Sequence, residues 1–86
     1  MKVTCSVEFD SKFESEWHTR RAIVLPLIDR IEEAESLADL GDILTCEAGA
    51  DYCVYNRICK LYFAYDTKNN AAELMGYAFR TFSEDV

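Results

Sequence analysis

Residues 57–65 constrain the fold most, because their side chains alternate in polarity with the two-residue period of a β-strand. The side chains predicted to face a core are Cys59, Leu61, Phe63 and Tyr65, and those predicted to face away are Lys60, Tyr62 and Ala64. An isolated pair of strands is only marginally stable in water. We therefore expect this strand at the centre of a small sheet of about three strands.

Two other segments have strand-like patterns. Residues 2–9 alternate strictly, with Val3, Cys5, Val7 and Phe9 predicted to face the core and Lys2, Thr4, Ser6 and Glu8 to face water. Residues 42–48 form the second candidate strand, followed by a turn at Gly49 and Ala50. Residues 52–55 leave two alternatives open: they extend this hairpin, or they form a bulged or turned insert that ends at Asn56.

Apolar residues at intervals of three and four predict a first helix over residues 13–37. Pro26 gives two alternatives within it, because proline lacks the amide hydrogen of a helical hydrogen bond. The segment is one helix kinked at Pro26, or two helices that meet near Leu25 with Pro26 in the first turn of the second. The apolar stripe continues on both sides of Pro26, which favours the kinked helix.

A second helix is predicted from Asn70 onward. Asn70 and Glu73 resemble a capping box, in which the two side chains bond to backbone amides at a helix start. The apolar residues that follow have helical spacing: Ala71, Leu74, Met75, Ala78, Phe79 and Phe82.

These elements predict a single α+β domain over residues 1–86, in the order β-α-β-β-α. The order resembles a ferredoxin-like fold that lacks its last strand, and this resemblance of architecture implies no function. A right-handed crossover would place both helices on one face of the sheet, with the strands in the order 1-3-2. The other face would be open to water, and the first strand would form an edge able to accept another strand.

The composition favours a protein of a reducing compartment that does not enter a membrane. The first ten residues lack the basic and apolar regions of a secretory signal, and the longest apolar stretch, residues 22–28, is too short to span a bilayer. We therefore expect a cytoplasmic protein whose four cysteines are reduced. Cys5 and Cys59 are predicted to be buried, whereas Cys46 and Cys53 flank the hairpin turn nearer the surface, where a reactive or paired thiol is an alternative.

No catalytic site is expected. His18 is the one histidine, and no serine or cysteine lies at a motif spacing that would make it part of a nucleophile pair. The three glycines do not form a phosphate-binding loop. Three thiols together with His18 leave a zinc site as an alternative, although their spacing lacks the paired clamp of structural zinc sites. We predict neither a cofactor nor a bound metal.

The excess negative charge is concentrated in residues 29–51. The net charge is −7, and this segment combines eight acids with a single base, Arg30. The acids are Asp29, Glu32, Glu33, Glu35, Asp39, Asp42, Glu47 and Asp51. The first three are spaced to share one helix ridge. The segment is either a solvated face that keeps the protein dispersed, or a surface whose carboxylates imitate nucleic-acid phosphates.

The leading functional hypothesis is a non-enzymatic protein-binding module, whose acidic segment, flanked by Tyr52 and Tyr55, binds a protein with a basic, nucleic-acid-binding surface. Small phage inhibitors of CRISPR or restriction systems are of this physical type. Four tyrosines (Tyr52, Tyr55, Tyr62 and Tyr65) invite comparison with RNA-stacking sheets, but a net charge of −7 repels phosphates, so direct nucleic-acid binding is not expected. The alternative is a structural or regulatory homo-oligomer, such as a homodimer, assembled through the open sheet face or the first-strand edge.

Overall fold

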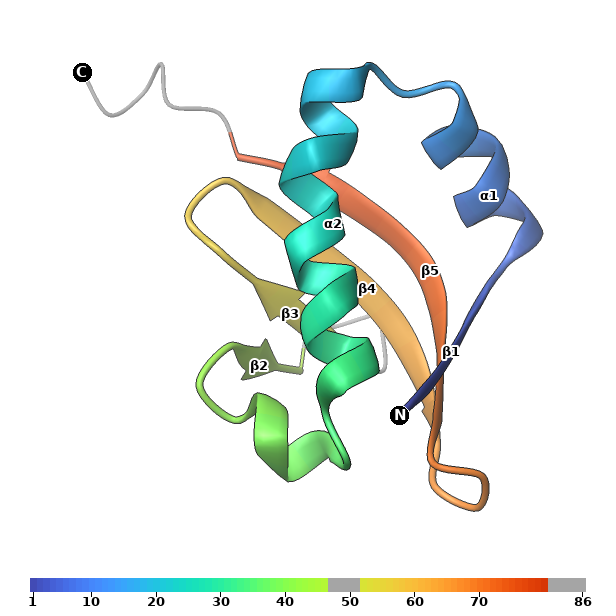
Figure 1. The fold of residues 1–86 in the computed structure, drawn as a ribbon, viewed down its shortest axis with the longest axis vertical. Coiled ribbons are helices and arrows are strands. Elements are labelled where there is room, and N and C mark those ends of the chain that lie inside the picture. Colours follow the sequence, from blue (N-terminus) through green and yellow to red (C-terminus); the bar gives the residue numbers. More distant parts are fainter. Residues whose placement is uncertain (47–51, 81–86) are drawn as a thin grey trace.

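The computed structural model describes residues 1–46 and 52–80, which form an α+β structure with a five-stranded mixed sheet (Figure 1). The elements in chain order are β1 (Lys2–Cys5), α1 (Val7–Glu14), α2 (His18–Glu33), the 3₁₀ helix η1 (Leu37–Leu40), β2 (Leu44–Thr45), β3 (Tyr52–Tyr55), β4 (Cys59–Asp66) and β5 (Ala71–Phe79). The predicted α+β class is confirmed, but the sheet has more strands than predicted. The predicted turn at Gly49 and Ala50 lies outside the described residues.

The strands lie in the order β1-β5-β4-β3-β2. The pairing is antiparallel throughout, except that β1 pairs in parallel with β5. β4 is therefore the central strand, as predicted, and its Cys59, Leu61 and Phe63 are buried. The predicted order 1-3-2 is wrong, because β5 separates β1 from β4. The ambiguous segment 52–55 is a regular strand that extends the hairpin.

The helix predicted from Asn70 onward is wrong, because its described residues form the strand β5. A β-bulge explains the misleading pattern: Gly76 pairs with Tyr62 and Leu74 pairs with Phe63, so Met75 is an extra residue in β5. The extra residue moves the inward-facing side from Ala72 and Leu74 to Tyr77 and Phe79. Apolar residues of the two faces, such as Leu74, Met75, Ala78 and Phe79, are therefore spaced by three and four positions although no helix forms.

The first strand is shorter than predicted, because a helix begins at Val7. Ser6 is the N-cap of α1, and its hydroxyl oxygen accepts a hydrogen bond from the amide of Phe9 at 3.1 Å. The predicted alternation over residues 2–9 is therefore wrong beyond β1, where Ser6 is buried and Val7 is exposed. Within β1, Val3 is partly buried but Cys5 is exposed. Phe9 is buried as predicted, but it reaches the core from a helix rather than a strand.

Neither alternative for residues 13–37 is correct. The chain has two helices, α1 and α2, but they separate at residues 15–17 and not near Leu25. Pro26 lies inside α2, and both Pro26 and Ala22 are exposed. The carbonyl of Ala22, which loses its helical partner at Pro26, therefore faces water that can hydrate it.

Both helices pack on one face of the sheet, but they are not the two helices predicted there, because the second predicted helix is the strand β5. Their buried side chains are Phe9, Val24, Leu27 and Ile31, which join Val54, Leu61, Phe63, Leu74 and Tyr77 of the sheet in one core. Figure 1 shows α2 crossing in front of the sheet, and α1 contacts β5. Within residues 1–46 and 52–80, no helix has the length and apolar character needed to cross a membrane.

Candidate functional site

Six of the predicted acidic site residues lie within the described ranges, and all six are exposed. Asp29, Glu32 and Glu33 are in the last turns of α2, and Glu35, Asp39 and Asp42 are in or beside η1. We call these six residues the acidic end. Figure 1 shows the C-terminal end of α2 and η1 at the same end of the molecule. Glu47 and Asp51 lie outside the described residues.

Two polar contacts stabilise the local conformation of the acidic end. The guanidinium Nη2 of Arg30 contacts Oδ1 of Asp42 at 2.8 Å, which joins α2 to the residues after η1. The carboxylate of Asp39 accepts a hydrogen bond from the amide of Glu35 at 2.9 Å. The hydrogen bond from Arg30 lowers the pKa of Asp42, so this carboxylate keeps its charge at lower pH. The first contact brings the carboxylate of Asp42 beside α2, twelve positions after Arg30 in the sequence.

The acidic end is fixed to the sheet through its backbone. The N-terminal amine of Met1 donates hydrogen bonds to the carbonyl oxygens of Glu32 at 3.1 Å and Ala34 at 2.5 Å. The side-chain amide of Asn70, in the turn between β4 and β5, donates to the carbonyl oxygen of Glu35 at 2.6 Å. None of these bonds uses a side-chain carboxylate. The fold therefore holds this end in place while its carboxylates face water.

The acidic end keeps most of its negative charge. In the part of the chain that the structure describes, Arg30–Asp42 is the one ion pair. The carboxylates of Asp29, Glu32, Glu33 and Glu35 have no ion-pair partner among the described residues. Exposed pairs such as Arg30–Asp42 contribute little to stability, so the pair chiefly fixes the local conformation.

The two predicted tyrosines of the site lie on opposite faces of the sheet. Tyr52 pairs with Phe63 and stacks on its ring at 5.8 Å between centroids, on the core side. Tyr55 pairs with Lys60 on the other face and is 37% exposed. The amide of Tyr55 donates to the carbonyl of Ile43 at 3.1 Å, which places Tyr55 beside the residue that follows Asp42. The structure does not bring both tyrosines together with the acids.

The cysteines differ from their predicted burial at two positions. Cys59 is buried as predicted, and this burial raises the pKa of its thiol to about 11. Cys5 is exposed because it ends the short edge strand β1, and Cys53 is buried in β3 although it was predicted nearer the surface. None of the four cysteines forms a disulfide bond. Among the described residues, no group of three His, Cys, Asp or Glu side chains is placed to hold a metal ion.

Sequence analysis missed an aromatic and cationic cluster that joins both helices to β5. Nζ of Lys12 lies 4.2 Å from the ring centroid of Tyr77, and the guanidinium of Arg20 lies 5.0 Å from that of Phe79. The hydroxyl of Tyr77 donates to a carboxylate oxygen of Glu16 at 3.0 Å. Burial and this hydrogen bond raise the pKa of Tyr77 to about 12. The cluster was not predicted, because the residues of β5 were expected to form a helix, which would have placed these aromatic side chains differently.

The remaining candidate, His18, is exposed at the first residue of α2. Its Nδ1 lies 3.3 Å from Nη2 of Arg21 on the same helix.

Comparison of the chain with models of protein families, with curated proteins and with solved structures finds no match.

Proposed function

We propose that the protein is a non-enzymatic protein-binding module whose acidic end binds a basic, nucleic-acid-binding surface of another protein. One observation supports the proposal above the rest: six exposed carboxylates lie in one short stretch of folded chain, with one ion pair among the described residues. Carboxylates spaced along a surface present charges much as backbone phosphates do. A small phage-type inhibitor of a CRISPR or restriction protein is the kind of protein that would use such a surface.

The physical role of the acidic end is to attract and orient a cationic partner. Concentrated charge of one sign raises association rates by about 10–1,000-fold, and salt weakens the effect. The Debye length is about 8 Å at physiological ionic strength, so the attraction acts only over a short range. Binding that depends on this surface should therefore weaken steeply as salt is raised.

The carboxylates divide into structural and available groups. Asp42 holds Arg30, and Asp39 holds the amide of Glu35, so replacing either would disturb the local fold as well as the charge. Glu32 and Glu33 make no such side-chain contact among the described residues, and both are exposed at the end of α2. Charge reversal at Glu32 and Glu33 is therefore the sharper test.

The experiment compares two double variants with the same change in net charge. E32K/E33K reverses two charges in the acidic end, whereas E14K/E73K reverses two exposed charges on α1 and β5. Each protein is immobilised and exposed to nucleic-acid-binding proteins of the native host, with and without added DNA or RNA as competitor. We expect wild type and E14K/E73K to retain a protein that nucleic acid displaces, and E32K/E33K to lose it.

The proposal is overturned if E32K/E33K retains the same proteins with the same salt dependence as wild type. It is also overturned if E14K/E73K loses binding equally, because the net charge and not the acidic end would then decide. Thermal unfolding of all three proteins shows whether a loss of binding reflects a loss of fold.

A homo-oligomer is the second candidate, and the position of β1 favours it. β1 ends the sheet, and its parallel pairing with β5 uses the amides of Lys2 and Ser6. The backbone groups of Val3 and Cys5 therefore alternate to the outer edge, where a second strand can pair. Light scattering over a concentration series tests this candidate, because a mass that stays at one chain at every concentration contradicts it.

A further inference from the structure

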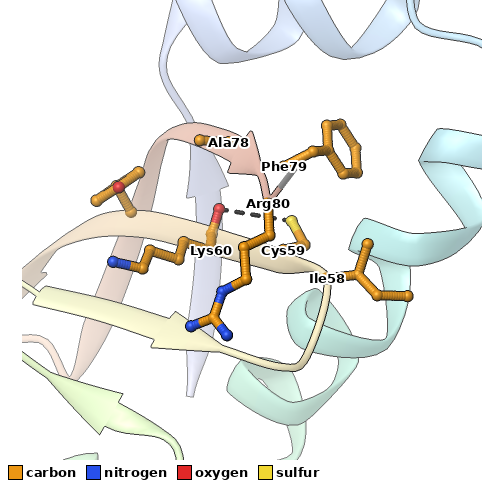
Figure 2. Close-up of a pocket in the computed structure, with 7 residues that line it drawn as sticks. Ile58, Cys59, Lys60, Ala78, Phe79 and Arg80 are labelled. Atoms are coloured by element: carbon orange, nitrogen blue, oxygen red, sulfur yellow. Dashed lines mark hydrogen bonds between the residues drawn. The ribbon is translucent and has the colours of Figure 1, made fainter. Parts of the chain in front are cut away.

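The edge of the sheet formed by β1 and the end of β5 is open only along β1. On one side, β5 pairs with β4 to its last residue, and Figure 2 shows this end of the two strands. The amide of Arg80 donates to the carbonyl of Ile58 at 2.6 Å just beyond it. On the other side, β5 pairs with β1 only over its first four residues. Past β1, the carbonyl oxygen of Tyr77 accepts a hydrogen bond from Nζ of Lys12 at 2.7 Å, so α1 covers that part of the edge.

The outer edge of β1 presents backbone groups that can bond to another strand. Alternate residues of β1 bond to β5, and the amides of Lys2 and Ser6 take part in this pairing. The amides and carbonyls of Val3 and Cys5 therefore point away from β5. They have no backbone partner among residues 1–46 and 52–80, and Figure 1 shows β1 at the margin of the sheet. Such a row of donors and acceptors is a template for strand pairing.

A second copy of β1 fits this edge in one antiparallel register. Two residues opposite each other in an antiparallel pair exchange two hydrogen bonds when their backbone groups point toward each other. If Val3 of each copy lies opposite Cys5 of the other, every outward-pointing group of these residues is used. Thr4 then lies opposite Thr4 of the second copy, on the two-fold axis that relates the copies. Registers shifted along the strand leave part of these groups without a partner.

The side chains suit this register. Two threonines directly opposite each other are a favourable cross-strand pair, because their hydroxyl groups can bond to each other. Lys2 lies opposite Ser6 of the second copy, so the paired strands do not place like charges opposite each other. Val7 follows Ser6 directly and therefore lies beside the N-terminal end of the other β1. This apolar side chain is 78% exposed in the single chain, and the second copy would shield it from water.

We propose that β1 pairs with β1 of a second copy of this chain in the Val3–Cys5 register, which joins the two five-stranded sheets into one continuous sheet. The proposal rests on the homo-oligomer, the second candidate function, and names its interface. The interface is small, so we expect a weak dimer with a Kd on the order of 0.1 mM. Each copy carries a net charge of −7, so salt should strengthen the dimer by screening their repulsion. The proposed binding of the acidic end to a basic protein has the opposite salt dependence.

The first test compares wild type with two variants that carry the same substitution. T4K places two lysines opposite each other on the two-fold axis, where like charges destabilise strand pairing. T67K introduces the same charge at an exposed threonine in the turn between β4 and β5. Light scattering of the full chain from about 0.01 to 1 mM should show a dimer for wild type and T67K, and dimerisation weaker by about tenfold or more for T4K. Thermal unfolding at low concentration checks that both variants remain folded.

The second test measures the register through a disulfide bond. Its background is C5S/C46S, in which both exposed cysteines are replaced. T4C then places two cysteines on the two-fold axis with their Cα atoms about 4.5 Å apart, within the range of a disulfide. K2C, at an exposed position on the same face of β1, places them about 14 Å apart, which is too far. With oxidised glutathione as the oxidant, T4C should form a covalent dimer and K2C should not.

The outcomes separate this interface from the two candidate functions. A wild-type mass of one chain at every concentration would overturn the interface together with the homo-oligomer. A wild-type dimer that T4K leaves unchanged, or that K2C cross-links as readily as T4C, would overturn the interface alone, because another surface would then join the copies. T4K leaves every carboxylate of the acidic end in place, so capture of a basic protein is decided by its own experiment.

Discussion

The neighbouring residues Leu74 and Met75 give the most decisive test of the fold. In β5, Leu74 is 0% exposed in the core, whereas the bulge residue Met75 is 46% exposed on the other face. In a helix over the same segment, both side chains would belong to the apolar stripe. Truncation of each to alanine therefore distinguishes the strand from the helix that the sequence pattern predicts.

The expected magnitudes differ severalfold. Removing a fully buried leucine side chain costs about 2–5 kcal/mol, from lost burial plus the cavity that remains. M75A should cost less than about 1 kcal/mol, because about half of the methionine is already in water. A domain of this size has a stability on the order of 4–13 kcal/mol. L74A therefore removes a large share of the total, and a loss of about 3 kcal/mol would lower Tm by roughly 12–24 °C.

Urea titrations followed by far-UV circular dichroism measure both variants against wild type. Circular dichroism is preferable to tryptophan fluorescence, because Trp17 is 77% exposed in the folded chain and would report the transition weakly. The expected result is a low midpoint for L74A and a nearly unchanged one for M75A, with similar slopes. Equal losses, or a larger loss for M75A, would refute the strand register.

Two further predictions concern pH and the turn before β5. Folding raises the pKa of Tyr77 to about 12 and that of Cys59 to about 11, so the stability that their protonated forms contribute is complete below about pH 9 and is lost as pH rises toward 12. Chemical unfolding from pH 8 to 11.5 should show this fall in stability, and Y77F should reduce it. If Y77F leaves the dependence of stability on pH unchanged, the assignment to Tyr77 is contradicted. Asn70 has φ of 48°, and its side chain bonds to Tyr65 and Glu35. N70A and N70G both lose those bonds, but N70A should be less stable than N70G by about 1 kcal/mol, because glycine adopts this φ without strain and alanine does not. Thermal unfolding of both variants measures the difference, and equal stabilities would contradict the prediction.

The strand β4 shows what a local pattern can predict. Its alternation runs without interruption from Cys59 to Phe63, and each inward side chain is buried in the structure. The strand therefore needed no knowledge of its neighbours to be identified. The same is true of the apolar positions Val24, Leu27 and Ile31 in α2, whose helical spacing matches their burial.

β5 shows where a local pattern fails. The bulge at Met75 is defined by pairing with β4, and it changes the inward-facing side in the middle of the strand. A strand with such a phase change has no single two-residue period, and its apolar residues fit the helical period better. The start of α1 was not predicted for a related reason. The alternation of side chains continues in the sequence to Phe9, but the strand ends earlier, where the amide of Phe9 donates a hydrogen bond to Ser6 and a helix begins.

The candidate sites differ in the same way. The residues of the acidic end are close together in the chain, so the sequence was sufficient to predict the concentration of negative charge. It was not sufficient to predict the contact between Arg30 and Asp42. The aromatic and cationic cluster combines Lys12 and Arg20 of the two helices with Tyr77 and Phe79 of β5, which meet only because both helices pack against β5. No spacing in the sequence indicates that meeting while β5 is taken for a helix.

The sequence by itself determined the α+β class, the central strand, the apolar faces of β4 and α2 and the concentration of negative charge, because each depends on residues close together in the chain. Tertiary structure decided the identity of β5, the order of the strands and the aromatic and cationic cluster. These depend on hydrogen-bond registers between distant segments, and a backbone pairing with a one-residue bulge changes which side chains are buried without changing any residue type.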